Sequence, residues 1–162
     1  MSKAKILIIY YSRSGNTKKM AELIVEGAKS VQDVDVVLKK VEETTVKDLL
    51  SADCIIMGSP VYYGSMAWQL KKLLDDSVSE HGSLDGKIGG AFASSGNIGG
   101  GNETTITNIL NAMLIHGMII FGDFQGDHYG PVSVGKPDQR VEKQCLRFGQ
   151  RLASLTKKLR NK

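Results

Sequence analysis

The 162-residue sequence has little of what marks several familiar classes of protein. Its two cysteines, Cys54 and Cys145, form no Cys-x-x-Cys pair and have no histidines beside them, which argues against a zinc site or a disulfide framework. No apolar run approaches the length of a membrane span, and the first residues lack the layout of a signal peptide. We therefore expect a cytoplasmic protein that has no membrane partner and buries both cysteines as small apolar residues.

The composition is that of an ordinary folded chain, and only its charge is unevenly placed. Hydrophobic residues make up 41% and charged residues 23%, and no linker, repeat or low-complexity segment divides the chain, so we expect one domain over residues 1–162. Nine of the 21 basic residues, but only two acidic ones, lie from Lys136 onward. These charges fall between apolar positions, as on the wet face of a packed helix, so we expect no nucleic-acid partner.

Strand-like and helix-like segments alternate along the chain. Apolar runs predict strands at residues 4–11, 34–41, 53–58, 87–94 and 118–121, the third stopped by Ser59 and Pro60. Helical spacing of apolar residues covers 20–31, 66–74, 106–114 with Gly117 as its cap, and the segment after Pro137, which we place at the first helical position. This order predicts an α/β fold with a doubly wound, five-stranded parallel sheet in the order 2-1-3-4-5.

Motifs of other α/β proteins are missing. There is no G-x-x-x-x-G-K-[ST] loop of an NTPase and no G-x-S-x-G nucleophile elbow, and the glycines from Gly96 to Gly101 do not fit the G-x-G-x-x-G dinucleotide pattern. A response-regulator receiver needs acidic residues after its first and third strands, where this chain has Tyr11-Ser12 and Ser59-Pro60. Those classes are therefore excluded.

The segments that follow the first, third and fourth strands carry the candidate site, because ligands of such sheets bind beyond the carboxyl ends of the strands. The first offers hydroxyls, an amide and a glycine at a helix N-terminus, which suits a phosphate but also an ordinary turn. The second offers adjacent tyrosines to a planar ring, although paired aromatics are also common in cores. The third is rich in glycine, so its backbone can approach the edge of a ligand closely, although such a segment is also typical of a flexible loop. The candidate residues are Ser12, Arg13, Ser14, Gly15, Asn16 and Thr17; Pro60, Val61, Tyr62, Tyr63 and Gly64; and Ser94, Ser95, Gly96, Asn97 and Gly99.

These motifs resemble those of the flavodoxin-like family. The run Ser12–Thr17 is similar to the family's FMN phosphate loop, and Gly58–Met66, Ser94–Ile106 and His116–Met118 resemble segments of WrbA-like NAD(P)H:quinone oxidoreductases. The resemblance spans residues 5–155. It implies that the first group of residues holds the phosphate of FMN, the second lines the isoalloxazine ring and the third lies on the far edge of that ring, while flavin N5 rather than a side chain does the chemistry.

The chain also departs from the WrbA-like pattern. The segment from Val41 to Asp53 is short where those enzymes have a longer one used in tetramer assembly, and Ile115-His116 replaces their paired histidines, the first of which lies at the flavin. The tryptophan that they carry before the fourth strand is missing from residues 79–85. The resemblance therefore supports FMN binding more strongly than it supports an acceptor or an assembly.

Two functions follow from the resemblance. The first is an FMN-dependent oxidoreductase that takes a hydride from NAD(P)H and reduces a small quinone-like acceptor. Such an enzyme is compatible with assembly as a homo-oligomer. The second is a flavodoxin-type electron carrier that serves a redox partner protein; familiar carriers are acidic, whereas this chain has a pI near 9.0. A carrier stabilises half-reduced flavin by flipping a backbone peptide near N5. We expect that peptide between Val61 and Tyr62, where no glycine makes a positive φ easy, so the sequence favours the enzyme.

Overall fold

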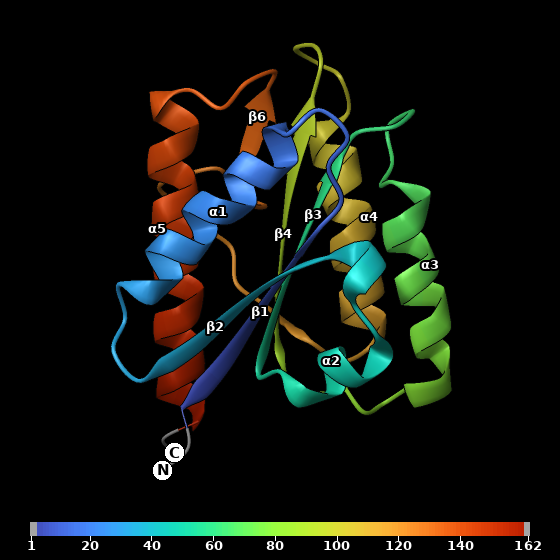
Figure 1. Ribbon diagram of the computed structural model, residues 1–162, viewed down its shortest axis with the longest axis vertical. Coiled ribbons are helices and arrows are strands. Elements are labelled where there is room, and N and C mark those ends of the chain that lie inside the picture. The colour runs from blue at the N-terminus through green and yellow to red at the C-terminus, as the bar shows by residue number, and fades with distance from the viewer. Residues whose placement is uncertain (1–2, 161–162) are drawn as a thin grey trace.

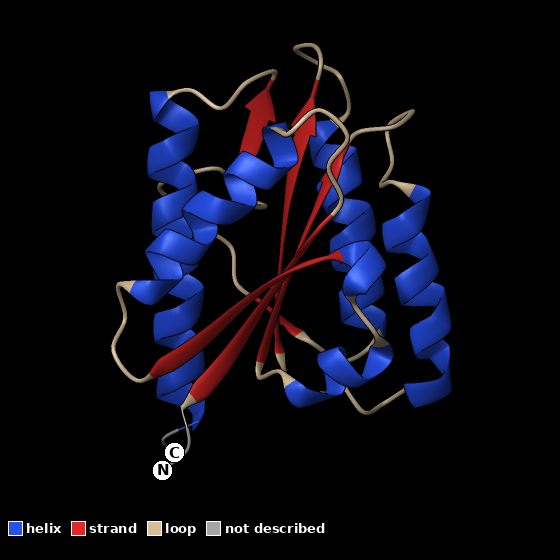
Figure 2. Cartoon of the chain, viewed as in Figure 1, coloured by secondary structure: helices blue, strands red, loops and turns tan. Residues whose placement is uncertain are grey.

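A computed structural model describes residues 3–160, and a parallel sheet lies between two layers of helices (Figures 1 and 2). The sheet order is β2-β1-β3-β4-β5, which confirms the predicted α/β fold and strand order. The strands are β1 (Ala4–Tyr10), β2 (Val34–Lys40), β3 (Cys54–Pro60), β4 (Ile88–Ser95), β5 (Ile119–Ile120) and β6 (Val132–Val134). The helices are α1 (Asn16–Lys29), α2 (Val46–Ser51), α3 (Trp68–Asp76), α4 (Asn102–Ile115) and α5 (Gln139–Arg160), with 3₁₀ turns η1 (Val41–Glu43) and η2 (Ser77–Glu80).

The edge of the sheet beyond β4 differs from the prediction of one fifth strand at 118–121. β5 has only two residues and pairs in parallel with the start of β4, at Ile88 and Gly89. β6, which the sequence pattern did not predict, pairs in parallel with the end of β4, at Ala93–Ser95. Two short segments therefore share the fifth position of the sheet, and the chain leaves the sheet between them.

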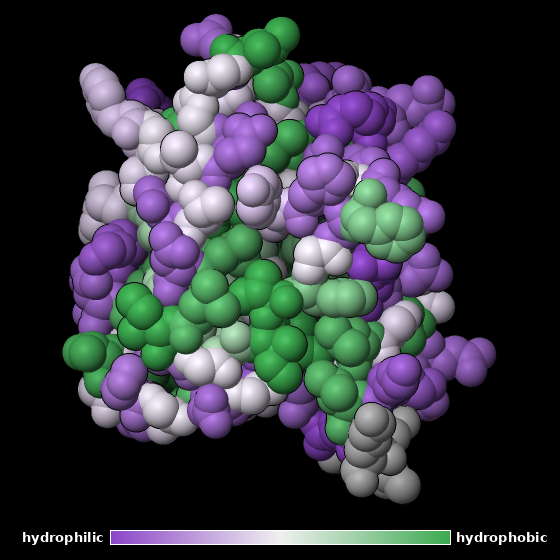
Figure 3. All heavy atoms as spheres, turned by 180° about the vertical axis from the view of Figure 1, so that it is seen from behind, coloured by the Kyte–Doolittle hydropathy of each residue, from purple (hydrophilic) through white to green (hydrophobic). Residues whose placement is uncertain are grey.

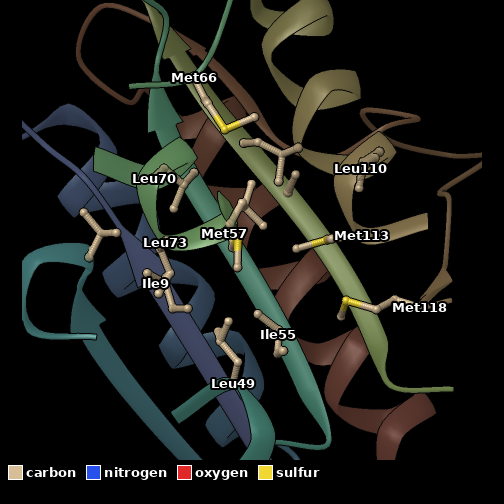
Figure 4. Packing of buried hydrophobic residues seen from close by; sticks show 14 of the residues in the cluster. Ile9, Leu49, Ile55, Met57, Met66, Leu70, Leu73, Leu110, Met113 and Met118 are labelled. Carbon is tan, nitrogen blue, oxygen red and sulfur yellow. The ribbon is translucent and has the colours of Figure 1, made fainter. Parts of the chain in front are cut away.

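Alternate residues of the central strands supply two separate cores. Ile6 and Ile8 of β1 point to the face covered by α1 and α5, while Leu7 and Ile9 point to the face covered by α3 and α4. Figure 4 shows the second core, in which Ile9 and Met57 of the sheet lie among side chains of the helices. A strand buried on both faces needs apolar residues at successive positions, which explains the near-continuous run in the sequence.

Three element ends refine the predictions. β3 continues through Pro60 instead of stopping at Ser59, and the backbone N–H of Val61 donates to the carbonyl of Ser94 at 2.8 Å. Gly117 takes φ +78° directly after α4, so a glycine ends this helix as predicted. The prediction that Pro137 is the first residue of the last helix is wrong, because α5 starts at Gln139 and the carboxylate of Asp138 accepts from the N–H of Val141 at 2.8 Å.

Both cysteines are buried, whereas part of the apolar surface is exposed (Figure 3). Cys54 and Cys145 are both buried and unpaired, and burial raises the pKa of each thiol to about 12. In residues 3–160, no helix combines the length and the apolar character that crossing a bilayer requires. Apolar side chains gather in a band across the face opposite to the view of Figure 1 (Figure 3). Exposed aromatics Phe121 and Phe124 follow β5.

Candidate functional site

Three loops meet beyond the carboxyl ends of β1, β3 and β4, at the top of Figures 1 and 2. We call residues 11–15 the first loop, 61–67 the second loop and 96–101 the third loop. The strand order reverses direction between β1 and β3, and open α/β sheets bind their ligands at such a point. The three loops contain one charged side chain, that of Arg13. The region is thus nearly neutral, with a single positive charge.

The first loop leads into α1, and the N-terminus of this helix has no side-chain cap. The N-cap residue is Gly15, which takes φ +96° and has no side chain that could cap the helix. The space where a Cβ would stand is open. The first turn of α1 holds no acidic residue that would neutralise its positive end. Upstream, the hydroxyl of Ser12 accepts from the N–H of Gly15 at 3.1 Å, while Arg13 and Ser14 are exposed. An uncapped, open helix N-terminus of this kind suits an anion.

Thr17 fixes α1 to the end of β4. Its hydroxyl lies 2.9 Å from the hydroxyl of Ser94, and both side chains are buried. Because the Thr17 hydroxyl already bonds to Ser94, its role is to hold the start of α1, and with it the first loop, in position. Its backbone N–H lies in the first turn of α1, where it has no partner within the helix.

The second loop is a tight turn centred on Tyr63 and Gly64. The N–H of Ser65 donates to the carbonyl of Tyr62 at 3.0 Å, and the N–H of Tyr62 donates to the carbonyl of Ser65 at 2.9 Å. Tyr63 has φ +50° and Gly64 has φ +74°, which are the positive angles of a type I′ turn. The central peptide of the turn therefore joins Tyr63 to Gly64, so the turn geometry favours a flip of this peptide over the Val61–Tyr62 peptide that we expected.

The aromatic side chains of the second loop are exposed, as the sequence predicts. Tyr63 is fully exposed, and Tyr62 has 36% of its surface exposed. The ring of Tyr62 lies 6.5 Å from that of Tyr11, centroid to centroid, and the two planes are tilted by 59°. Tyr11, which directly follows β1, was not among the predicted site residues. Its position directly after an apolar strand was the only signal in the sequence.

The third loop is held by the residues on either side of it. The hydroxyl of Ser95 donates to the carbonyl of Asn97 at 2.9 Å and accepts from the side-chain amide of Asn102 at 2.9 Å. The side-chain carbonyl oxygen of Asn102 is buried and has no hydrogen-bond partner among residues 3–160. A buried acceptor without a partner is unusual, and it lies at the base of an exposed glycine-rich loop. Sequence reasoning missed Asn102.

Backbone contact joins the second and third loops. A Cβ on Gly101, which takes φ +99°, would stand 2.9 Å from the Cα of Gly64 and 3.3 Å from a methyl group of Val61. Close by, the side-chain amide of Asn108 donates to the hydroxyl of Ser65 at 3.2 Å. Only glycine allows this approach, so Gly101 belongs to the site although we did not predict it.

The structure thus places the predicted residues on three adjacent loops, with different degrees of contact. Thr17 and Ser94 touch each other, and Pro60, Val61 and Ser95 lie at strand ends that pair or bond directly. Asn16 is the first residue of α1 and is half-exposed. The remaining predicted residues lie in the exposed or half-exposed parts of the loops: Ser12, Arg13, Ser14, Gly15, Tyr62, Tyr63, Gly64, Gly96, Asn97 and Gly99. No group of His, Cys, Asp and Glu within residues 3–160 has the arrangement of a metal site.

Comparison with known proteins identifies the family. A family profile described as "Flavodoxin domain" matches residues 7–104. A flavodoxin of Aquifex aeolicus is 46% identical over 92% of this chain and 85% of its own length. An NAD(P)H dehydrogenase (quinone) of Geotalea daltonii is 40% identical over 75% of this chain and 74% of its own. The chain belongs to the flavodoxin family, as its motifs predict. This family implies FMN as the redox cofactor.

A solved structure supports the fold independently. The flavodoxin, WrbA-like protein of Agrobacterium tumefaciens superposes with a TM-score of 0.81 over 96% of this chain and 99% of its own, at 24% identity.

The local geometry also fits FMN. The start of α1 is open and uncapped, two tyrosines stand exposed beside it in the second loop, and the backbone of the third loop is bare.

Proposed function

We propose that this chain is an FMN-dependent oxidoreductase that accepts a hydride from NAD(P)H and reduces quinone-like acceptors. The first loop and the start of α1 would hold the phosphate of FMN, the second loop would line the flavin ring, and the third loop would cover the edge of that ring. When bound, FMN supplies the hydride-accepting chemistry, while the loops bind, orient and shield it. The residues assigned to these three roles are Ser12–Thr17, Pro60–Gly64, and Ser94–Asn97 with Gly99.

The geometry of the second loop carries this proposal. Flipping the Tyr63–Gly64 peptide would convert the type I′ turn into a type II′ turn, in which the first central residue keeps a positive φ with an extended ψ. That position strongly favours glycine, and here it is occupied by Tyr63. A turn that resists the flip would offer a bound flavin no additional backbone hydrogen bond. Such a site favours transfer of two electrons together, as a hydride-accepting enzyme requires.

Charge and similarity add support. The pI near 9.0 speaks against a carrier of the familiar acidic kind, which docks on a basic redox partner by charge. The 40% identity to the quinone-reducing relative covers three quarters of the chain.

The second candidate function is that of an electron carrier without a substrate of its own. The 46% identity to a flavodoxin over nearly the whole chain favours it. The apolar band in Figure 3 and the exposed aromatics after β5 offer a surface for a protein, whether a redox partner or a second copy of this chain.

Turnover separates the two candidates. Purified protein loaded with FMN is given NADH or NADPH, with and without benzoquinone, and loss of nicotinamide absorbance is followed. The enzyme oxidises NAD(P)H in repeated turnovers and faster with benzoquinone. Protein that retains FMN but oxidises neither nucleotide is a carrier.

A further inference from the structure

Ser59 is a polar residue at a place in β3 where the surrounding core is apolar. Alternate residues of this strand face α3 and α4, and that face is occupied by Ile55, Met57 and Ser59. Figure 4 shows Ile55 and Met57 among the apolar side chains of this core. Ser59 is 0% exposed. Because a hydroxyl loses its water when it is buried, it is tolerated there only with hydrogen-bond partners inside the protein.

Both partners of the Ser59 hydroxyl lie at the ends of the second loop. The hydroxyl donates to the carbonyl of Pro60, which directly precedes the loop, at 2.8 Å. It accepts from the backbone N–H of Ala67, the last residue of the loop, at 2.8 Å. Ala67 is 1% exposed and is the N-cap residue of α3. One buried side chain therefore joins the two ends of the loop and connects the end of β3 to the start of α3.

Within residues 3–160, two side chains from outside the second loop form hydrogen bonds with it. The first is that of Ser59. The second is that of Asn108, whose amide donates to the hydroxyl of Ser65 at 3.2 Å at an exposed position. Water competes for an exposed hydrogen bond but not for a buried one, so the Ser59 bond contributes more to the position of the loop. The turn at Tyr63 and Gly64 closes on itself and does not determine where the loop lies.

We propose that Ser59 is a positioning residue for the flavin ring, because its hydroxyl holds the second loop in the place where the ring would bind. Ser59 has no exposed surface, so it acts through the loop and does not touch FMN. This inference rests on the proposed function in one respect only, the assignment of the second loop to the flavin ring. It involves neither NAD(P)H nor an acceptor.

Titration of the flavin-free protein with FMN and with riboflavin tests the proposal, because the two flavins differ only in the phosphate. In Ser59→Ala the N–H of Ala67 loses its acceptor, and the second loop must shift to find another. Both flavins should therefore bind about tenfold more weakly, and by the same factor, since the first loop is unchanged. The visible circular dichroism of the bound flavin should also change, because the ring meets a displaced loop.

Ser77→Ala is the matched control. Ser77 is 1% exposed and also has two hydrogen-bond partners. Its hydroxyl donates to the carbonyl of Leu74 at 2.7 Å and lies 2.9 Å from Nε2 of His116. It follows the other end of α3, away from the second loop. Ser77→Ala should lose stability to urea, as Ser59→Ala does, but bind both flavins normally. Equal affinities in Ser59→Ala and the parent, or equal losses in the two variants, would overturn the proposal.

A second variant applies if Ser59→Ala fails to fold. Ser59→Cys fills the same space with only a weak acceptor, so it should also lose affinity for both flavins. A Ser59→Cys protein that binds them as tightly as the parent contradicts the proposal, and so does a loss confined to FMN, which would place the effect in the first loop. None of these readouts uses NAD(P)H. A parent protein that binds both flavins but oxidises no nucleotide therefore refutes the proposed function alone.

Discussion

The hydroxyls of Thr17 and Ser94 lie 2.9 Å apart in the interior, although 77 positions separate the two residues in the sequence. Thr17 belongs to the first turn of α1 and Ser94 to the last part of β4. The bond therefore fixes the start of a helix against the end of a strand. The first loop, which precedes α1, and the third loop, which follows β4, depend on this bond for their relative position.

Removing either hydroxyl should destabilise the protein. In Thr17→Val the Ser94 hydroxyl is left in a buried space without its partner, which costs about 1–3 kcal/mol. Ser94→Ala should cost a similar amount, and the double variant should lose less than the two single losses together. Urea unfolding measures all three. Additive losses would show that the two hydroxyls do not interact.

A negative charge in the first loop should abolish retention of FMN. Ser14 is exposed, so Ser14→Asp leaves the fold intact while placing a carboxylate against the phosphate of the cofactor. Flavin absorbance of the purified protein measures retention. Ser154→Asp, at an exposed position of α5, is the control and should remain yellow. A Ser14→Asp protein as yellow as its parent would refute the assignment of the phosphate to this loop.

A methyl group on Gly101 should disturb the site more than the fold. In Gly101→Ala the new Cβ meets the Cα of Gly64 at 2.9 Å, so the second and third loops must separate. We expect at least tenfold weaker FMN binding, measured by quenching of flavin fluorescence. Gly82→Ala has a similar positive φ with nothing within 4 Å of the new Cβ, so it tests backbone strain alone and should bind FMN normally. Equal effects of the two substitutions would remove Gly101 from the site.

The two tyrosines of the second loop should matter for affinity and little for stability. Tyr63 is fully exposed and Tyr62 is partly exposed, so changing both to Ala removes little packing from the apoprotein. Their rings should cover the flavin, and their loss should weaken FMN binding. Calorimetric titration with FMN and thermal unfolding of the apoprotein measure the two quantities. A large loss of stability with unchanged affinity would make them packing residues.

The sequence predicts the core strands well because burial on both faces leaves a strong pattern. The run from Ile6 to Ile9 is apolar at every position, and each of these residues is almost completely buried. β6 could not be predicted in the same way. Val132, Ser133 and Val134 are too few to show a period, and their pairing with the end of β4 depends on a contact about 40 positions away.

The candidate site, like the fold, could be predicted only in part from the sequence. Its loops could be located because each follows a strand end, and the fold brings those ends together. Which residues touch across the loops could not be predicted. The contact of Gly101 with Gly64 and the approach of Tyr11 to Tyr62 depend on the path of three loops in space, and no spacing in the sequence encodes that path.

Stepwise photoreduction of the FMN-loaded protein, followed by its absorbance spectrum, tests the central claim most directly. The resistance of the Tyr63–Gly64 peptide to flipping predicts direct conversion of oxidised to fully reduced flavin, with little of the half-reduced form at any stage. Tyr63→Gly should raise the half-reduced fraction, because glycine allows the flipped turn. Abundant, long-lived half-reduced flavin in the unaltered protein would contradict the account and make this chain a one-electron carrier.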